Sequence, residues 1–151
     1  MTIEEEMKQS RFGSAYEKLA FNLIYSNRWL EDFLKKRFGE QGLTMQQYNI
    51  LRILRGSRPD PLSTLQIRER MIDKMSDTSR IVDRLLVKEL VTKQPSTVDN
   101  RLVEVRITTK GLRLLKKLDE IDRDIAVHLS KITEAEAALV SDVLDKMHSK
   151  T

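Results

Sequence analysis

Apolar residues recur along the first quarter of the chain at the spacing of a helix. Over residues 16–38 they fall close to every 3.6 residues, which predicts one long amphipathic helix. Its apolar face is wider than one side of a small domain needs, so we expect part of it to meet a second chain. The segment 39–42, with a glycine at each end, ends this helix.

A hydroxyl residue followed three positions later by glutamine or glutamate marks the start of three further helices. In this capping box each side chain satisfies a backbone N–H of the other residue. It occurs at Thr44, Ser63 and Thr133. The first two boxes predict helices over residues 44–55 and 64–71, and the third predicts the last helix of the chain.

A further helical pattern covers residues 77–89, after a short connector. Ser76 is its expected N-cap, which places Asp77 in the first turn, where the helix dipole favours a negative charge. The outer face of this helix is polar and mainly cationic: Ser79, Arg80, Asp83, Arg84 and Lys88. Two helices joined in this way form a helix-turn-helix pattern. An isolated helix with such a face is more often a solvated surface whose cations pair with Asp83.

Hydrophobic spacing then changes from the period of a helix to that of a strand. Apolar and polar residues alternate over residues 102–107, and residues 91–94 form a second strand candidate across a polar loop. Thr108 then caps a helix predicted over residues 109–131. The expected fold is therefore mostly α, with about six helices and a small β-hairpin wing after the helix-turn-helix.

The wing carries the most specific motif of the sequence. Asp99-Asn100-Arg101 precedes an alternating strand that ends in Ile107, Thr108, two further residues and Gly111. Together with residues 79–85 as a recognition helix, this pattern resembles the MarR family of bacterial transcriptional regulators. The resemblance extends over nearly the full length of the chain.

The resemblance implies an intertwined homodimer with two functional regions. These are a winged helix-turn-helix DNA-binding domain over residues 44–108 and a helical dimerisation region formed by residues 1–43 and 109–151. Three positions depart from the family pattern. Arg68 stands where a small residue usually packs, Ile72 where glycine often opens the turn, and Glu89 where glycine often caps the recognition helix.

A helix fits the major groove of B-DNA, and the residues at its N-terminal end meet base edges. Arg80 is the favoured base contact, because a guanidinium can bond guanine bidentately. Arg84 and Lys88 are expected to meet phosphates or to fold back on Asp83. The predicted DNA-binding residues of this helix and its entry are Ser76, Asp77, Thr78, Ser79, Arg80, Arg84 and Lys88.

On the wing, the resemblance implies that Arg101 enters the minor groove, where narrow A·T-rich stretches concentrate negative potential. Asp99 then orients Arg101, and an Asx-turn that only shapes the loop is an equal alternative. The charge distribution agrees with DNA binding, because residues 80–110 hold seven basic and four acidic residues. That excess is most of the net charge of +4.

Composition narrows the function classes. The 151 residues include no cysteine, which excludes disulfides, thiolate nucleophiles and Cys-based zinc sites. The two histidines, His128 and His148, cannot alone build a metal site, so neither a metal nor a cofactor is expected. No apolar run approaches the roughly 18 residues of a membrane span, and the acidic N-terminus is unlike a signal peptide. We therefore expect a cytoplasmic protein without a membrane partner.

These observations predict a DNA-binding transcriptional repressor. As a homodimer it is expected to read a pseudo-palindromic operator with half-sites about 10 bp apart, or a small multiple of that. The alternatives are a winged-helix module that binds only protein, a coiled-coil scaffold and an enzyme. The hairpin argues against a scaffold, and Arg80 with Arg101 favours DNA over protein. No Gly-rich phosphate loop or nucleophile–base spacing supports an enzyme, and His128 lies among apolar residues, where packing is the usual role.

The first helix holds a candidate effector site. Phe21, Tyr25 and Trp29 are spaced four residues apart, so their side chains lie along one face, and Arg28 offers a cation nearby. Many proteins of the resembled family respond to phenolic compounds, which implies a small aromatic or apolar anion as the ligand that releases DNA. Plain core packing or a dimer contact is the alternative for these aromatics.

Overall fold

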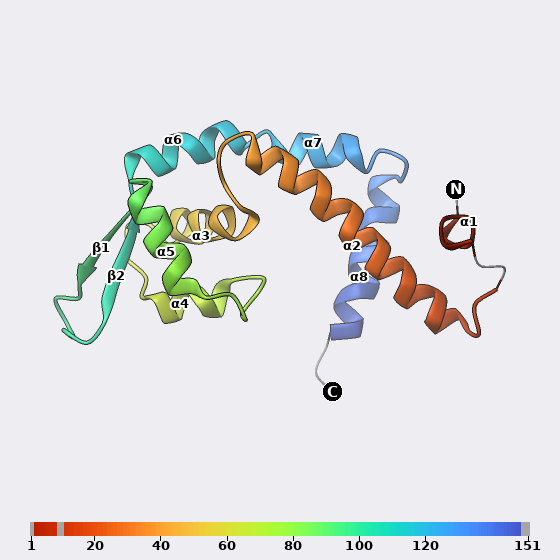
Figure 1. Ribbon diagram of the computed structural model, residues 1–151, viewed down its shortest axis with the longest axis horizontal. Coiled ribbons are helices and arrows are strands. Elements are labelled where there is room, and N and C mark those ends of the chain that lie inside the picture. Colours follow the sequence, from red (N-terminus) through yellow and green to blue (C-terminus); the bar gives the residue numbers. More distant parts are fainter. Residues whose placement is uncertain (1, 9–10, 149–151) are drawn as a thin grey trace. The chain divides into compact units, whose positions relative to one another are not determined.

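The computed structural model describes residues 2–8 and 11–148 (Figure 1). The chain forms two compact units, which divide between Leu115 and Lys116. Most of the described residues are helical, and a two-stranded antiparallel hairpin is the sheet that they form. This confirms the predicted fold class, a mostly α winged helix-turn-helix. None of the described helices combines the length and apolarity needed to cross a membrane.

The winged helix-turn-helix consists of α3, α4, α5 and the hairpin. In chain order the elements are α1 (Ile3–Met7), α2 (Ala15–Gly39), α3 (Met45–Gly56), α4 (Thr64–Arg70), α5 (Thr78–Val87), β1 (Val91–Pro95), β2 (Val103–Ile107), α6 (Thr109–Leu118), α7 (Ile121–His128) and α8 (Glu134–His148).

The sequence predicts about six helices, whereas the described residues form eight. α1 lies in the acidic N-terminal segment, to which the hydrophobic pattern assigns no element. The predicted helix over residues 109–131 is divided at Asp119 and Glu120 into α6 and α7. Leu118 and Ile121 are buried on either side of the division. The apolar period therefore continues through the interruption and does not mark it.

One core holds the recognition helix and the wing together. Ile50 and Leu51 of α3, Val82 and Leu85 of α5 and Val105 of β2 are all fully buried. α3 contacts both α5 and β2, and α4 packs against α5. The orientation of the wing is therefore fixed by the same apolar contacts that position α5.

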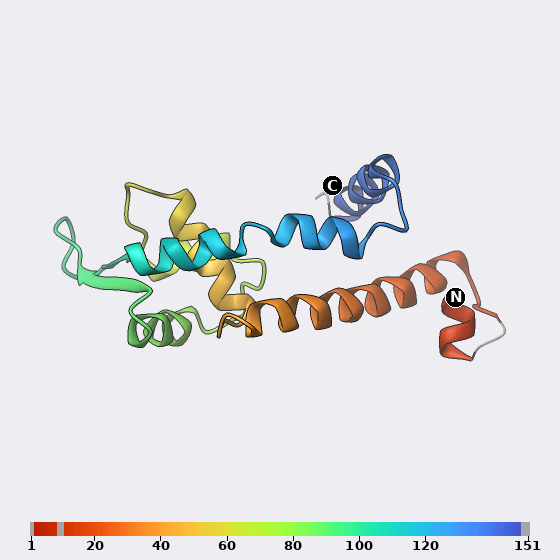
Figure 2. The ribbon, with the colours of Figure 1, turned by 90° about the horizontal axis from the view of Figure 1, so that it is seen from above.

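The wing is a short hairpin that extends away from α3, α4 and α5 in both views (Figures 1 and 2). Its two strands agree to within one residue with those predicted from the alternating pattern. Leu62, before α4, extends the sheet by one residue. Its N–H donates to the Val105 carbonyl at 3.1 Å, and its carbonyl accepts the Val105 N–H at 2.8 Å. The loop before α4 is thereby attached to the middle of β2.

All three predicted capping boxes form. The reciprocal pairs are Thr44 with Gln47, Ser63 with Gln66, and Thr133 with Glu136. The N-cap expected for α5 is wrong, because Asp77 and not Ser76 takes that position. The Asp77 carboxylate accepts the Arg80 N–H at 3.2 Å. Ser and Asp are comparable N-caps, and here the Ser76 hydroxyl is bonded instead to Asp73 at 2.8 Å.

Two of the three departures from the family pattern are accommodated by side-chain contacts. Glu89 has a φ of 60°, the left-handed conformation that favours glycine. Its carbonyl accepts the Thr108 hydroxyl at 2.8 Å, which holds the helix end in this conformation. The backbone N–H of Ile72 donates to the Asn49 side-chain oxygen at 3.0 Å, and the Ile72 side chain lies in solvent.

The second unit contains α7 and α8. Ile121 of α7 is buried, but no residue of α8 is. Leu139, Val143 and Met147 of α8 are 47 to 63% exposed and recur every four residues, so they lie along one face. α8 therefore presents an apolar stripe that this unit does not cover.

The glycine that ends the wing motif is required by a close backbone approach. A Cβ at Gly111 would lie 2.5 Å from the Leu90 carbonyl oxygen and 2.7 Å from Cγ1 of Ile107. Both distances are far inside van der Waals contact. Only glycine lets α6 begin this close to the segment that follows α5.

We expect Gly111→Ala to lower the free energy of unfolding by about 1 to 3 kcal/mol, the usual cost of an overpacked site. Gly56→Ala is the matched control, because nothing lies within 4 Å of a Cβ at the end of α3. That control should be neutral or slightly stabilising. Urea unfolding followed by circular dichroism compares the two variants. Equal midpoints would contradict the close approach.

Candidate nucleic-acid interface

The connector between α4 and α5 is organised by its own side chains. The Asp73 carboxylate accepts the Met75 N–H at 3.0 Å and the Ser76 hydroxyl at 2.8 Å. The predicted DNA-binding residue Ser76 therefore also stabilises the turn. Sequence reasoning does not identify Asp73. Its signal is that of an Asx-turn, in which an Asp side chain accepts the backbone N–H two residues later.

The predicted readers at the start of α5 differ in exposure. Thr78 is only 4% exposed, and its hydroxyl lies 3.5 Å from the Met71 sulfur and 3.4 Å from the Ser76 carbonyl oxygen. Its side chain thus packs inside the turn. Ser79 and Arg80 are exposed, so they remain the candidates for base contacts in the first turn of the helix.

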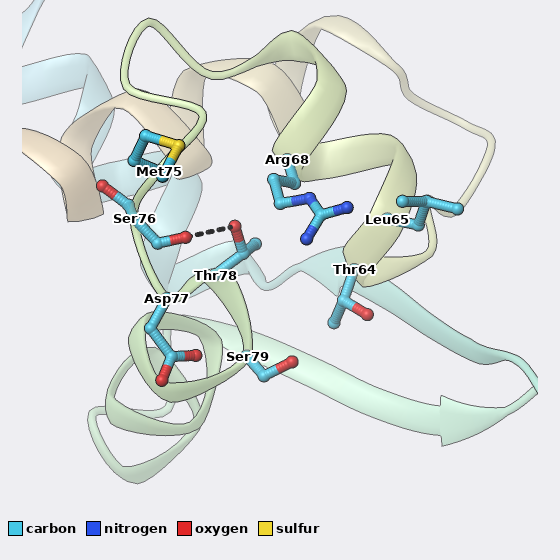
Figure 3. Close-up of a pocket in the computed structure, with 8 residues that line it drawn as sticks. All are labelled: Thr64, Leu65, Arg68, Met75, Ser76, Asp77, Thr78 and Ser79. Atoms are coloured by element: carbon cyan, nitrogen blue, oxygen red, sulfur yellow. Dashed lines mark hydrogen bonds between the residues drawn. The ribbon is translucent and has the colours of Figure 1, made fainter.

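Two cavities flank the N-terminus of α5. The one between α4 and α5 has a volume of about 390 Å³ and is lined by Thr64, Leu65, Arg68, Met75, Ser76, Asp77, Thr78 and Ser79 (Figure 3). The one between α3 and α5 has a volume of about 270 Å³ and is lined by Thr44, Gln46, Gln47, Ser76, Asp77, Arg80, Ile81 and Arg84. The residues predicted at the helix start therefore lie together around these two cavities.

Lys88 is not part of that group. Its ammonium donates to the Gly42 carbonyl and to the Gln47 side-chain oxygen at 3.2 Å. These contacts tie the end of α5 to the loop before α3. The predicted phosphate contact of Lys88 would have to replace them, which the spacing along the helix does not reveal.

Asp83 likewise has a partner outside its own helix. Its carboxylate pairs with Lys93 of β1 at 2.9 Å. The alternative in which Asp83 neutralises the cations of α5 is thereby weakened, because one carboxylate oxygen is engaged by the wing. Arg84 is left exposed on the outer face of the helix.

A second ion pair joins the end of α5 to α6. The Glu89 carboxylate pairs with Lys110 at 2.8 Å, and this hydrogen bond lowers the pKa of Glu89. A lowered pKa means that the pair stabilises the fold above the ordinary pKa of glutamate and loses this effect as the pH falls. Both side chains are largely exposed, so the contribution to stability is small.

The tip of the wing is built by Ser96 and Asp99. The buried Ser96 hydroxyl accepts the N–H groups of Val98 at 3.2 Å and Asp99 at 3.4 Å. The Asp99 carboxylate accepts the Arg101 N–H at 2.9 Å, which is the Asx-turn alternative. Asp99 therefore shapes the backbone from which the exposed Arg101 side chain extends. Sequence reasoning misses Ser96, whose signal is a hydroxyl two residues before the turn.

The candidate effector residues lie on α2, next to the N-terminal segment. The rings of Phe21 and Phe12 have centroids 5.6 Å apart. Partial desolvation and the nearby Glu6 carboxylate of α1 raise the pKa of the Tyr25 hydroxyl. Trp29 is 41% exposed. Part of the aromatic face is thus in contact with the chain's own N-terminus.

Known proteins match this chain in sequence and in fold. The profile of the MarR family matches residues 43–103. The HTH-type transcriptional regulator MhqR of Bacillus subtilis (strain 168) is 27% identical, over 86% of this chain and 89% of MhqR. The HTH-type transcriptional repressor IacR of Pseudomonas putida is 30% identical, over 68% of this chain and 61% of IacR.

The crystal structure of a MarR transcription factor from Planctomyces limnophilus is 31% identical, with a TM-score of 0.67, over 91% of this chain and 98% of that chain. The chain belongs to the MarR family. MarR-family proteins are transcriptional regulators and not enzymes. This MarR-family chain is therefore a transcriptional regulator, and a catalytic role for His128 has no support.

Proposed function

We propose that this MarR-family regulator is a repressor that binds a pseudo-palindromic operator as a homodimer. In this proposal α5 of each protomer enters the major groove and Arg101 of each wing enters the adjacent minor groove. Two-fold symmetry then sets half-sites about 10 bp apart, or a small multiple of that. The name of IacR as a repressor supports the direction of regulation.

The division of the positive charges is the observation that carries the proposal. Within the described residues, the guanidinium groups of Arg80, Arg84 and Arg101 make no ion pair or hydrogen bond with another side chain. Lys93 and Lys110, by contrast, are paired at the surface with Asp83 and Glu89. Free arginines can pair with DNA without breaking an internal contact, and their fork geometry suits both phosphates and guanine.

Uncovered apolar surface supports the dimer. Phe38 is the buried residue of α2, although that helix has 25 residues, and α8 has none. Exposed apolar faces of this extent mark a protein interface in a soluble protein. We assign dimerisation to the helical regions of residues 1–43 and 109–151, and DNA binding to residues 44–108.

The effector in this proposal is a small aromatic or apolar anion, phenolic in the simplest case. Phe21, Tyr25 and Trp29 supply one aromatic face of α2, and Arg28 supplies a cation. Such a ligand releases DNA only if it binds the DNA-incompetent spacing of the two recognition helices more tightly than the competent one. Contact with the N-terminal segment is the competing role, with Phe12 beside Phe21 and Glu6 of α1 beside Tyr25.

Arg101→Ala should weaken binding to an operator selected from a random duplex pool by about 1 to 3 kcal/mol and leave the fold intact. Arg80→Ala should weaken it by a similar amount and also relax base preference. Fluorescence anisotropy at fixed salt measures both effects. Arg101→Lys keeps the charge and loses the fork, so it separates the two contributions. Unchanged binding by Arg101→Ala would rule out the minor-groove contact.

In light scattering at micromolar concentration the protein should have twice the mass of its 17.6 kDa chain. Val143→Asp should shift it toward the monomer, because it places a charge within the apolar stripe of α8. Ser141→Asp is the control, since it lies on the opposite side of the same helix. A uniform monomer for the parent protein would refute the dimer.

Trp29 is the single tryptophan of the chain, so its fluorescence reports on the proposed effector face alone. Titration with salicylate-like compounds should change this emission and release the selected operator over the same concentration range. Arg28→Ala should raise the concentration required without changing operator affinity. If no such compound affects both signals at sub-millimolar concentration, the effector site is wrong.

A further inference from the structure

We propose that Arg68 is an additional DNA-binding residue of this regulator, which contacts a backbone phosphate of the strand that passes α4. The inference rests on the proposed placement of α5 in the major groove. It assigns a function to a side chain that departs from the family pattern, where a small residue is usual.

Arg68 lies on α4, and its guanidinium extends into the cavity of about 390 Å³ between α4 and the start of α5. Figure 3 shows the guanidinium between Thr64 of α4 and Thr78 of α5, with the Ser79 hydroxyl at the same opening. The cavity therefore presents one cation and several hydroxyl groups, which are donors for an oxyanion, and one carboxylate, that of Asp77.

No partner within the protein neutralises this cation. Among the described residues, the Arg68 side chain makes no hydrogen bond or ion pair. The Asp77 carboxylate lines the same cavity, but it accepts the Arg80 N–H as the cap of α5. The neighbouring Asp73 carboxylate is bonded to Met75 and Ser76. Both acidic groups are held by the turn, and Arg68 remains available.

Packing does not require an arginine at this position. The buried residues here are Ile67 of α4 and Met71, the C-cap of this helix. Arg68 itself is exposed, so its charge is presented to solvent without disturbing the core. This exposed position explains how the chain tolerates the large side chain. The role of Arg68 therefore lies at the protein surface.

The dimensions of DNA indicate that a backbone phosphate is the partner of Arg68. The major groove is about 12 Å wide, and a helix with its side chains is about 10 to 12 Å across. A helix inserted there has the phosphates of one strand on each side. Arg84 lines the cavity on the α3 side of α5, and Arg68 lines the cavity on the α4 side. The two arginines are thus placed to contact opposite strands.

Salt dependence tests the assignment, because each lost phosphate contact lowers the slope of log K against log salt by about 0.9. The probe is a fluorescein-labelled mixed-sequence 30-bp duplex, titrated over a range of KCl concentrations. Arg68→Ala should lower the slope by that amount for each protomer bound, and Arg68→Lys should restore most of it. Arg70→Ala is the matched control, because Arg70 lies in the same helix and does not line the cavity. Thermal unfolding verifies that each variant is folded.

A second measurement separates phosphate from base contacts. Duplexes selected from a random pool by the parent and by Arg68→Ala should share the same preferred sequence. A changed preference would mean that Arg68 reads bases, and an unchanged salt slope would mean that it does not touch DNA. Equal losses from Arg68→Ala and Arg70→Ala would indicate net charge alone. Each of these results overturns this assignment while the parent still binds DNA. Failure of the parent to bind any duplex would instead refute the proposed function itself.

Discussion

The contact between the end of the wing and the segment that follows α5 is the one on which the winged helix-turn-helix depends. The Thr108 N–H donates to the Leu90 carbonyl at 3.0 Å, and its hydroxyl donates to the Glu89 carbonyl at 2.8 Å. Thr108, the residue after β2, thereby holds Glu89 and Leu90, which follow the C-cap of α5. Gly111 lets the first turn of α6 approach the same Leu90 carbonyl. Because β1 begins and β2 ends at this junction, a shift of α5 must carry the base of the wing with it.

Contacts between neighbouring elements determine which charges remain for a ligand. Asp83 and Glu89 each form an ion pair with a lysine of a neighbouring element, and Lys88 is hydrogen-bonded to the loop before α3. Exposed pairs of this kind add little stability. Their larger effect is on selectivity, because a lysine that is already paired attracts phosphate less at its own place on the surface. Among the described residues, the arginines beside the helix start and at the wing tip have no such partner, and a guanidinium is the side-chain group whose fork geometry suits phosphates and bases.

Local signals in the sequence are sufficient for most of the fold. A capping box needs only two side chains three residues apart, so Thr44, Ser63 and Thr133 are identified without tertiary information. Alternation likewise locates the strands. The choice between Ser76 and Asp77 as the cap of α5 is different, because it depends on whether Asp73 bonds the serine, and only the folded connector decides that.

The candidate site is less accessible to sequence reasoning, since charge and spacing do not reveal partners that are distant in sequence. Lys88 shares the outer face of α5 with Arg84, yet its bond to Gly42 spans 46 residues. Thr78 has the polarity of a base reader, and the fold buries it against Met71. The motif residues Asp99 and Gly111 are recognisable in the sequence because their roles are set by the backbone around them.

Asp77 shows how the requirements of folding and of DNA binding meet at one atom. It places a carboxylate at the end of α5 that faces the proposed DNA, where its charge opposes phosphate. The backbone N–H of Arg80 and the positive end of the helix dipole offset part of that charge. An uncapped α5 would lose about 1 kcal/mol and the fixed start on which the direction of Arg80 depends.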